Sequence, residues 1–185
     1  MFKKVIVPGL LGGIVLILWT FIVNGVFGFK SSMDMKHIAN ENQVYEILKE
    51  NINEPGKYTC NPQVTTSGFP GNEPAFSILY GGLGHEAAGW LMLVQLPLFF
   101  LAPLLGALML SFTSKKIMLS YIRRVLFFTG IGLLIALFSD LMNFGIGNYP
   151  PTDALIFALH DIVVWTVIGL VVAWRMRPDS NLETE

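Results

Sequence analysis

Hydrophobic residues in this chain are gathered into four long blocks instead of being spaced at the periods of amphipathic helices or strands. The blocks cover Val5–Phe27, Ala87–Phe112, Val125–Phe144 and Ala154–Trp174, and their only acidic or basic residues are Asp140 and Asp161. Because a helix rises ~1.5 Å per residue, each block can cross the ~30 Å hydrocarbon core of a membrane. The pattern predicts a polytopic all-α membrane protein, a four-helix transmembrane bundle.

A longer polar segment between the first two blocks predicts how the chain is divided. We expect a first span over residues 1–27, an extracytoplasmic insertion over 28–84, spans two to four over 85–177, and a cytoplasmic tail over 178–185. The first block has the basic start of a signal peptide, but its apolar run is far longer than the ~7–15 residues usual for one. It is therefore expected to stay in the protein as a span.

The insertion combines a helical period with two strand-like segments and is expected to be a small α+β element. A helix is expected from about Met35 to Ile52, with one apolar face: Val44, Ile47, Leu48 and Ile52. Short extended segments are expected at Lys57–Cys60 and Ala75–Tyr80, around the loop Asn61–Pro74. So few elements are not stable alone, so the apolar face must pack on the strands, on the spans or on the membrane surface.

The distribution of basic residues predicts the orientation. Of the 12 Lys and Arg, eight flank the spans on one side: Lys3, Lys4, Lys115, Lys116, Arg123, Arg124, Arg175 and Arg177. By the positive-inside rule both termini are cytoplasmic, and the insertion and the turn Gly145–Asp153 face outward. We expect a bacterial inner membrane, with the lipid bilayer as the first partner, a membrane protein docked on the periplasmic insertion as a possible second, and no basic patch for nucleic acid.

Composition narrows the classes further. In 185 residues, 53% are hydrophobic and 14% charged, which excludes a disordered or highly charged binding protein. Cys60 is the only cysteine, so no internal disulfide or thiol pair can form. No motif for a nucleotide or another cofactor is found, and no cofactor is expected.

Two resemblances bear on the fold and the chemistry. Gly12-Gly13-Ile14-Val15-Leu16-Ile17-Leu18-Trp19 followed by Asn42-Gln43-Val44 and Pro55-Gly56-Lys57-Tyr58, with three further spans, resembles a family of small four-span bacterial membrane proteins of uncharacterised activity. That resemblance implies the same topology. The segment from Asp140 to Asn148, with Thr152-Asp153-Ala154, is similar to the outer ends of spans three and four in lipoprotein signal peptidases.

The second resemblance implies an intramembrane aspartyl peptidase with Asp140 and Asp153 as its catalytic pair. The stretch between the two aspartates is shorter than in that family, and its asparagine-containing motifs in spans two and three are missing. Asp153 can instead cap the start of span four, using its side-chain oxygen on free backbone N–H groups.

Ionisable residues gather near the outer ends of spans two to four. The predicted cluster comprises His85, Glu86, Asp140, Asn143, His160 and Asp161. Charges at membrane depth cost ~2.5–3.5 kcal/mol each even on the lenient insertion scale, so these acids need protonation, a charged His partner, a bound cation or water. Small residues that could bring these helices together are Gly84, Ala88, Gly130, Ala136 and Gly169, and Gly9-x-x-x-Gly13 in span one is a separate helix-contact motif of low specificity.

The cluster has three interpretations. It is a hydrogen-bonded cap that holds the helices in register, a divalent-cation site, or a catalytic or proton-conducting group. We favour a non-enzymatic accessory or binding component whose polar cluster and insertion contact a partner, lipid or cation. The alternatives are the aspartyl peptidase and a cation or proton pathway using Asp140, His160 and Asp161.

Overall fold

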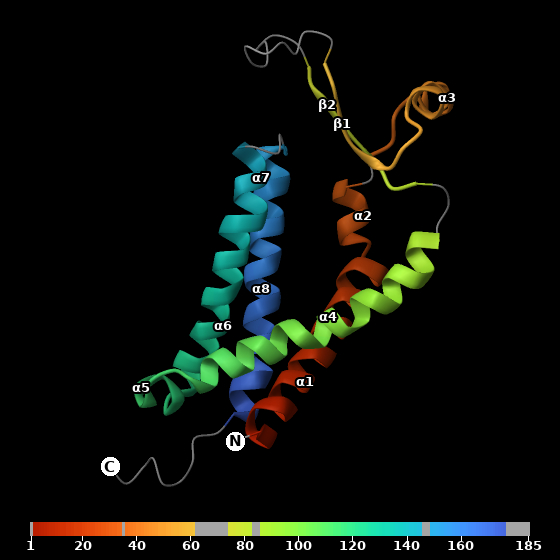
Figure 1. Ribbon diagram of the computed structural model, residues 1–185. Coiled ribbons are helices and arrows are strands. Elements are labelled where there is room, and N and C mark those ends of the chain that lie inside the picture. The colour runs from red at the N-terminus through yellow and green to blue at the C-terminus, as the bar shows by residue number, and fades with distance from the viewer. Residues whose placement is uncertain (1, 35, 62–73, 83–85, 146–148, 177–185) are drawn as a thin grey trace. The chain divides into compact units, whose positions relative to one another are not determined.

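The fold predicted from the sequence is confirmed by the computed structural model, which describes residues 2–34, 36–61, 74–82, 86–145 and 149–176 (Figure 1). Within these ranges, four helices are long and apolar enough to cross a membrane: Lys3–Val26, Leu93–Ser111, Tyr121–Leu141 and Pro151–Arg175. A two-stranded hairpin lies between the first and second spans. The chain forms two compact units, residues 1–35 with 94–185 and residues 36–93.

The first span is a helix with an irregular C-terminal end. Helix α1, Phe2–Thr20, continues directly into a π-helical segment, η1, Phe21–Val26. Gly28 then adopts a φ of +60°, a left-handed conformation that interrupts the helix at little steric cost to glycine. A short helix α2, Phe29–Asp34, follows. The helical structure therefore extends past Phe27, where the apolar block ends.

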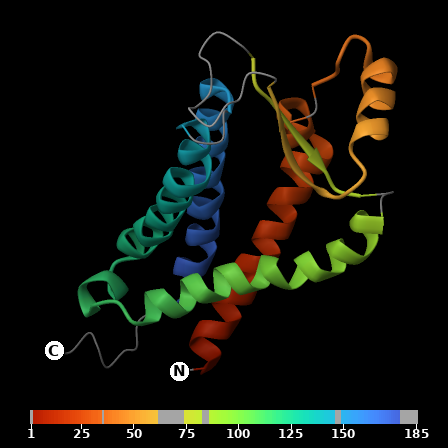
Figure 2. The ribbon, with the colours of Figure 1, turned by 45° about the horizontal axis from the view of Figure 1, so that its top comes forward.

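The remaining spans come from the C-terminal part of the chain. Helix α4 covers Glu86–Ser111 and is joined through α5, Lys115–Met118, to α6, Tyr121–Ile135. A second π-helical segment, η2, Ala136–Leu141, continues α6 and leads into α7, Met142–Gly145. Helix α8, Pro151–Arg175, completes the chain's regular structure in the described ranges. Figures 1 and 2 show α6 and α8 running side by side.

The larger unit has one apolar core to which all four spans contribute. Its centre is Phe128 of α6, fully buried and stacked on Trp165 of α8 with ring centroids 6.3 Å apart. The cluster comprises Val5, Ala107, Leu110, Phe128, Val164, Trp165, Ile168, Val172 and Met176. Since Val5 lies near the start of α1 and Met176 directly after α8, these two ends meet at the same end of the unit.

Many large apolar side chains on the spans are exposed at the protein surface. Phe138 is 78% exposed, Leu134 64% and Leu155 61%. Soluble monomers rarely expose apolar surface on this scale, whereas a lipid-facing helix does so along its length. The spans thus have the surface expected for contact with a bilayer.

Arg124 does not flank the third span but lies buried within its first turns. Helix α6 begins at Tyr121, and Arg124 within it is 5% exposed. Its guanidinium donates to the carbonyl of Ala173, 3.2 Å away, and to that of Met118. Because Ala173 lies in the last turn of α8, where carbonyls lack helical partners, the buried cation satisfies a group that the helix leaves open.

The smaller unit pairs an amphipathic helix with the hairpin. Strands β1, Gly56–Cys60, and β2, Phe76–Tyr80, are antiparallel, with Tyr58 opposite Ile78. Both segments agree with the predicted extended segments within a residue. Most of the intervening loop, residues 62–73, lies outside the described residues.

The predicted helix of the insertion is too long at its N-terminus. Helix α3 covers Glu41–Asn51, with Asn40 at the N-cap position and residues 36–40 not helical, while Met35 lies outside the described residues. The apolar face begins only at Val44, so earlier residues have no burial to gain from joining the helix. Asn also favours a cap over a helix interior. Ile47, expected on the packed face, is 53% exposed.

Candidate functional site

His160 is the centre of a hydrogen-bonded network between the first and fourth spans. The indole N–H of Trp19 donates to His160 Nε2 across 3.0 Å, and His160 Nδ1 lies 3.1 Å from Asp161 Oδ1. Because an indole N–H can only donate, Nε2 must accept and carry no proton. The ring proton is then on Nδ1 and is donated to Asp161. With this tautomer the Asp161 carboxylate accepts the Nδ1–H of a neutral imidazole.

Aromatic rings enclose the imidazole. Phe29 of α2 stacks on the His160 ring with centroids 5.1 Å apart and an interplanar angle of 17°. The same Phe29 meets Phe157 edge to face at 5.9 Å, and Phe157 in turn meets Tyr149 at 6.4 Å. The side chains of His160 and Asp161 are 19% and 29% exposed. The network and its rings hold α1, α2 and α8 together.

Asp140, unlike Asp161, has a carboxyl oxygen outside any hydrogen-bonded network of the described residues. It lies on η2, and its Oδ2 atom is buried with no hydrogen-bond partner among the described residues. The carboxyl borders a small cavity of about 170 Å³, lined by Lys30, Asp140, Asn143, Tyr149, Ala154 and Phe157. The ionisable groups close enough to act on Asp140 are Asp161, His160 and Lys30. Two predicted cluster members, Asp140 and Asn143, thus share one cavity.

Lys30 faces this cavity without neutralising Asp140 directly. Among the described residues, Lys30 forms no ion pair within 4 Å. The cavity is therefore bordered by one positive and one negative side chain that do not touch. We refer to it below as the Lys30–Asp140 cavity.

The remaining two predicted cluster residues have side chains outside the described part of the chain. His85 lies outside the described residues, and Glu86 begins α4. Across the described ranges, no group of three or more His, Cys, Asp or Glu residues is arranged to hold a metal ion. Both nitrogens of His160 are already used, by Trp19 and Asp161.

Asp153 corrects the expectation of an N-terminal cap. The N-cap of α8 is Pro150, and Asp153 lies inside the first turn of the helix. An acid there still interacts favourably with the positive end of the helix dipole. Asp153 is not among the residues that line the Lys30–Asp140 cavity. The Asp140–Asp153 catalytic pair stays a prediction.

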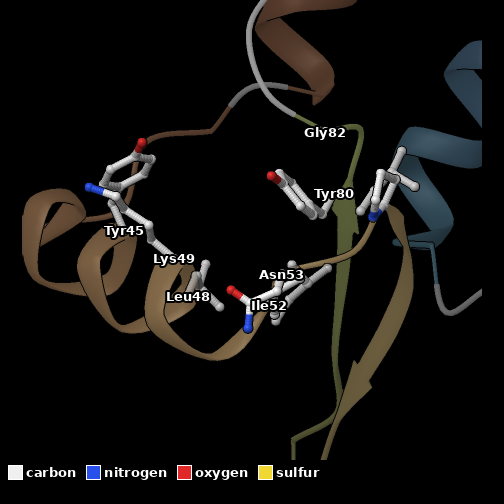
Figure 3. Close-up of a pocket in the computed structure, with 10 residues that line it drawn as sticks. Tyr45, Leu48, Lys49, Ile52, Asn53, Tyr80 and Gly82 are labelled. Atoms are coloured by element: carbon white, nitrogen blue, oxygen red, sulfur yellow. The ribbon is translucent and has the colours of Figure 1, made fainter.

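A second, larger hollow lies within the smaller unit. It has a volume of about 690 Å³ and lies between α3 and β2, where Tyr45 and Tyr80 face each other above Leu48 and Ile52 (Figure 3). Its polar lining includes Lys49, whose Nζ is 3.6 Å from Glu46 and 5.8 Å from the centroid of the Tyr45 ring. The apolar face of α3 thus looks toward the hairpin, one of the three packing options predicted.

No protein-family model, curated protein or solved structure matches this chain. Both resemblances noted in the sequence stay predictions, and the site is interpreted from its own geometry.

Two residues of the site were missed by the sequence analysis. Trp19 lies inside an uncharged apolar block, where nothing marks it as a hydrogen-bond donor to a distant histidine. Lys30 follows that block by three residues and was grouped with the charges of the insertion. A signal for Lys30 did exist: Gly28 followed by a helix-compatible segment allows the chain to continue beside the spans.

Proposed function

We propose that this chain is a non-enzymatic component of a bacterial inner membrane that binds a small charged ligand at the outer ends of its spans. Support comes from one observation: Lys30 and Asp140 border the same cavity without forming an ion pair, and Asp140 Oδ2 is buried without a partner. A buried acceptor left unsatisfied costs ~1–3 kcal/mol, and more when it is charged. A ligand that donates to Asp140 would offset that penalty.

The ionisable residues then divide into two groups with different tasks. Trp19, His160 and Asp161 satisfy one another and hold the helices in register. Asp140 and Lys30 have charges directed at a shared space. This division favours binding over the two alternatives. A peptidase would need the carboxyl group of Asp153 beside that of Asp140. A cation pathway would need the side chains of His160 and Asp161 free to bind the transported ion.

The proposed orientation has both termini in the cytoplasm and the insertion in the periplasm. It is supported by the eight basic residues that flank the spans on one side, against four within the first loop. The cavity, near the end of the third span and the start of the fourth, then lies at the outer leaflet. A partner protein is proposed to dock on the periplasmic insertion.

Native mass spectrometry of the full-length protein, extracted from its own membrane in mild detergent, tests the binding function. We expect the wild type to carry a small-molecule adduct. The single variants Asp140→Asn and Lys30→Gln should each reduce the occupancy of that adduct at least tenfold. Asp140→Asn is isosteric, and Lys30→Gln keeps a polar side chain with the same number of heavy atoms while removing the charge. Unchanged melting temperatures would show that the variants fold.

Asp153→Asn is the matched control, since Asp153 does not border the cavity. It should retain the adduct. Wild-type protein without any adduct, or equal occupancy in all variants, would contradict the binding function. Cleavage of a lipid-anchored peptide that is lost in both Asp140→Asn and Asp153→Asn would establish the peptidase instead.

A further inference from the structure

The Lys30–Asp140 cavity presents opposite charges from separate elements. Lys30 is on α2, after the first span, whereas Asp140 is on η2, at the end of the third. Ala154 and Phe157 of α8 complete the lining between them. A simple cation would be attracted by Asp140 and repelled by Lys30, and a simple anion would meet the reverse. A ligand that carries both charges, separated by a short linker, satisfies both side chains at once.

The size of the cavity limits that ligand to a few heavy atoms. Its volume of about 170 Å³ is below the ~300–1,000 Å³ typical of sites for drug-sized ligands. An amino group joined to a phosphate by two carbons fits this scale, whereas a nucleotide or a folded peptide does not.

The negative side of the cavity favours a primary ammonium. Asp140 Oδ2 is a buried acceptor without a partner among the described residues, and Asn143 supplies a side-chain carbonyl on the next turn. A primary ammonium has three N–H donors for such acceptors, and a quaternary ammonium has none. The rings of Tyr149 and Phe157 also border the cavity, and aromatic faces attract cations.

The depth of the cavity matches that of lipid headgroups. Asp140 is the second-last residue of the third span, Tyr121–Leu141, and Ala154 is the fourth residue of the last span, Pro151–Arg175. Both therefore lie within about 5 Å of a span end along the helix axis. Lipid headgroups border the hydrocarbon core at this level, and each carries its phosphate within reach of an interfacial lysine.

We propose that the Lys30–Asp140 cavity binds an aminoethyl phosphate group, the headgroup chemistry of phosphatidylethanolamine. Lys30 contacts the phosphate, and Asp140 with Asn143 accepts hydrogen bonds from the ammonium. This inference rests on the proposed binding function and names its ligand class. The same chemistry is found in the lipid and in soluble phosphoethanolamine.

Lipid competition on the intact protein tests the assignment. Full-length protein in phosphatidylcholine nanodiscs would be titrated with phosphatidylethanolamine or phosphatidylglycerol, and retained lipid measured by native mass spectrometry. We expect the wild type to prefer phosphatidylethanolamine over phosphatidylcholine at least tenfold. Asp140→Asn should abolish that preference, since it removes the negative charge that selects the ammonium. Lys30→Gln should weaken retention of both phosphatidylethanolamine and phosphatidylglycerol.

Two controls and one further arm complete the experiment. Asp153→Asn and Lys49→Gln change charges away from the cavity and should retain the wild-type preference. Soluble phosphoethanolamine should compete with the lipid, because both carry the recognised group. Binding at least as tight as that of the lipid would assign the ligand to a soluble source, and much weaker binding would assign it to a bilayer lipid.

The failures of the two proposals are distinguishable. Equal retention of phosphatidylethanolamine and phosphatidylcholine by the wild type would overturn the headgroup assignment, as would a preference unaffected by Asp140→Asn. If phosphatidylglycerol or methylammonium still bound in a manner dependent on Lys30 or Asp140, the binding function would stand. If no probe bound in that manner, both would fall.

Discussion

Glycine positions decide how closely the spans approach one another. A Cβ atom built on Gly9 would lie 2.7 Å from Leu104 Cα, and one on Gly13 would lie 2.9 Å from Phe100 Cα. These contacts confirm that the Gly9-x-x-x-Gly13 spacing marks a helix contact, here with α4. Gly169 likewise receives Phe128, whose Cβ is 2.6 Å from the built atom. Ala136 is 1% exposed, whereas Gly84 and the side chain of Ala88 lie outside the described residues.

Gly130 and Gly132 show the limit of that reasoning. Gly130, predicted to be a packing residue, has nothing within 4 Å of a built Cβ. Gly132, two positions on, lies against the backbone of α8. A Cβ atom built on Gly132 would lie 3.0 Å from both Ile162 Cα and Asp161 O. Both glycines sit in the same apolar block, so only the rotation of α6 toward α8 distinguishes them.

These two glycines form a matched pair for a stability test. Gly132→Ala should lower the free energy of unfolding by ~1–3 kcal/mol, since the new methyl group meets backbone that cannot move without separating α6 from α8. Gly130→Ala should be neutral or stabilise by up to ~1 kcal/mol through helix propensity. Thermal unfolding in detergent measures both. Equal melting temperatures for the two variants would contradict the close contact at Gly132.

At the scale of elements, the two π-helical segments coincide with the polar region of the spans. Segments η1 and η2 end the first and third spans, and each carries a buried oxygen without a partner among the described residues: Asn24 Oδ1 and Asp140 Oδ2. π-helical turns are rare in proteins, and those that occur are often found at functional sites. The extra residue in the turn rotates the following side chains away from their α-helical positions. Both segments lie at the C-terminal ends of their spans, and Asp140 of η2 lines the Lys30–Asp140 cavity.

The contact of α1 with α8 through Trp19 and His160 can be tested by Trp19→Phe. The ring is retained but the donor is lost, so we expect a decrease of ~1 kcal/mol in the free energy of unfolding. In ¹⁵N-histidine NMR spectra, the wild-type His160 should have a protonated Nδ1 and a hydrogen-bonded Nε2. The variant should shift the Nε2 signal toward that of a free acceptor.

Trp174→Phe is the control for this change. Trp174 lies on the same span as His160, is 59% exposed and should leave both the stability and the His160 signals unchanged. The other two histidines, His37 and His85, can be separated from His160 by recording His160→Gln. A wild-type Nε2 that carries the proton would contradict the network.

At the scale of the whole molecule, the native Cys60 makes the orientation testable without an added label. Cys60 ends β1 in the insertion and is exposed. In cells that retain their inner membrane, a membrane-impermeant maleimide should label Cys60, because the insertion is proposed to face the periplasm. In a Cys60→Ser background, Ser114→Cys should be labelled only after the membrane is opened.

Asn53→Cys in the same background provides a positive control within the insertion. Labelling of Ser114→Cys from outside, or protection of both Cys60 and Asn53→Cys, would reverse the orientation. The Lys30–Asp140 cavity would then belong to the inner leaflet, and its headgroup would be tested there.

The class of the protein and its division into spans and insertion follow from the sequence alone. Hydrocarbon thickness demands long uncharged helices, and the four blocks meet that demand regardless of how the helices pack. The hairpin is equally local, since β-propensity and the turn-rich loop between its strands mark it. The helix ends do not follow from it: α3 begins six residues later than expected, because an apolar face indicates where a helix packs and not where it starts.

The site was decided by tertiary structure. Sequence analysis identified Asp140, Asn143, His160 and Asp161 as a group, because charges in apolar blocks are costly wherever they lie. It could not show which of these residues hold the helices in register and which line the proposed binding cavity. Trp19 and His160 are 141 positions apart, and Lys30 reaches the Asp140 cavity only because the chain continues as α2 beyond Gly28. Such pairings depend on helix rotation and π-helical geometry, which hydrophobic periodicity does not determine.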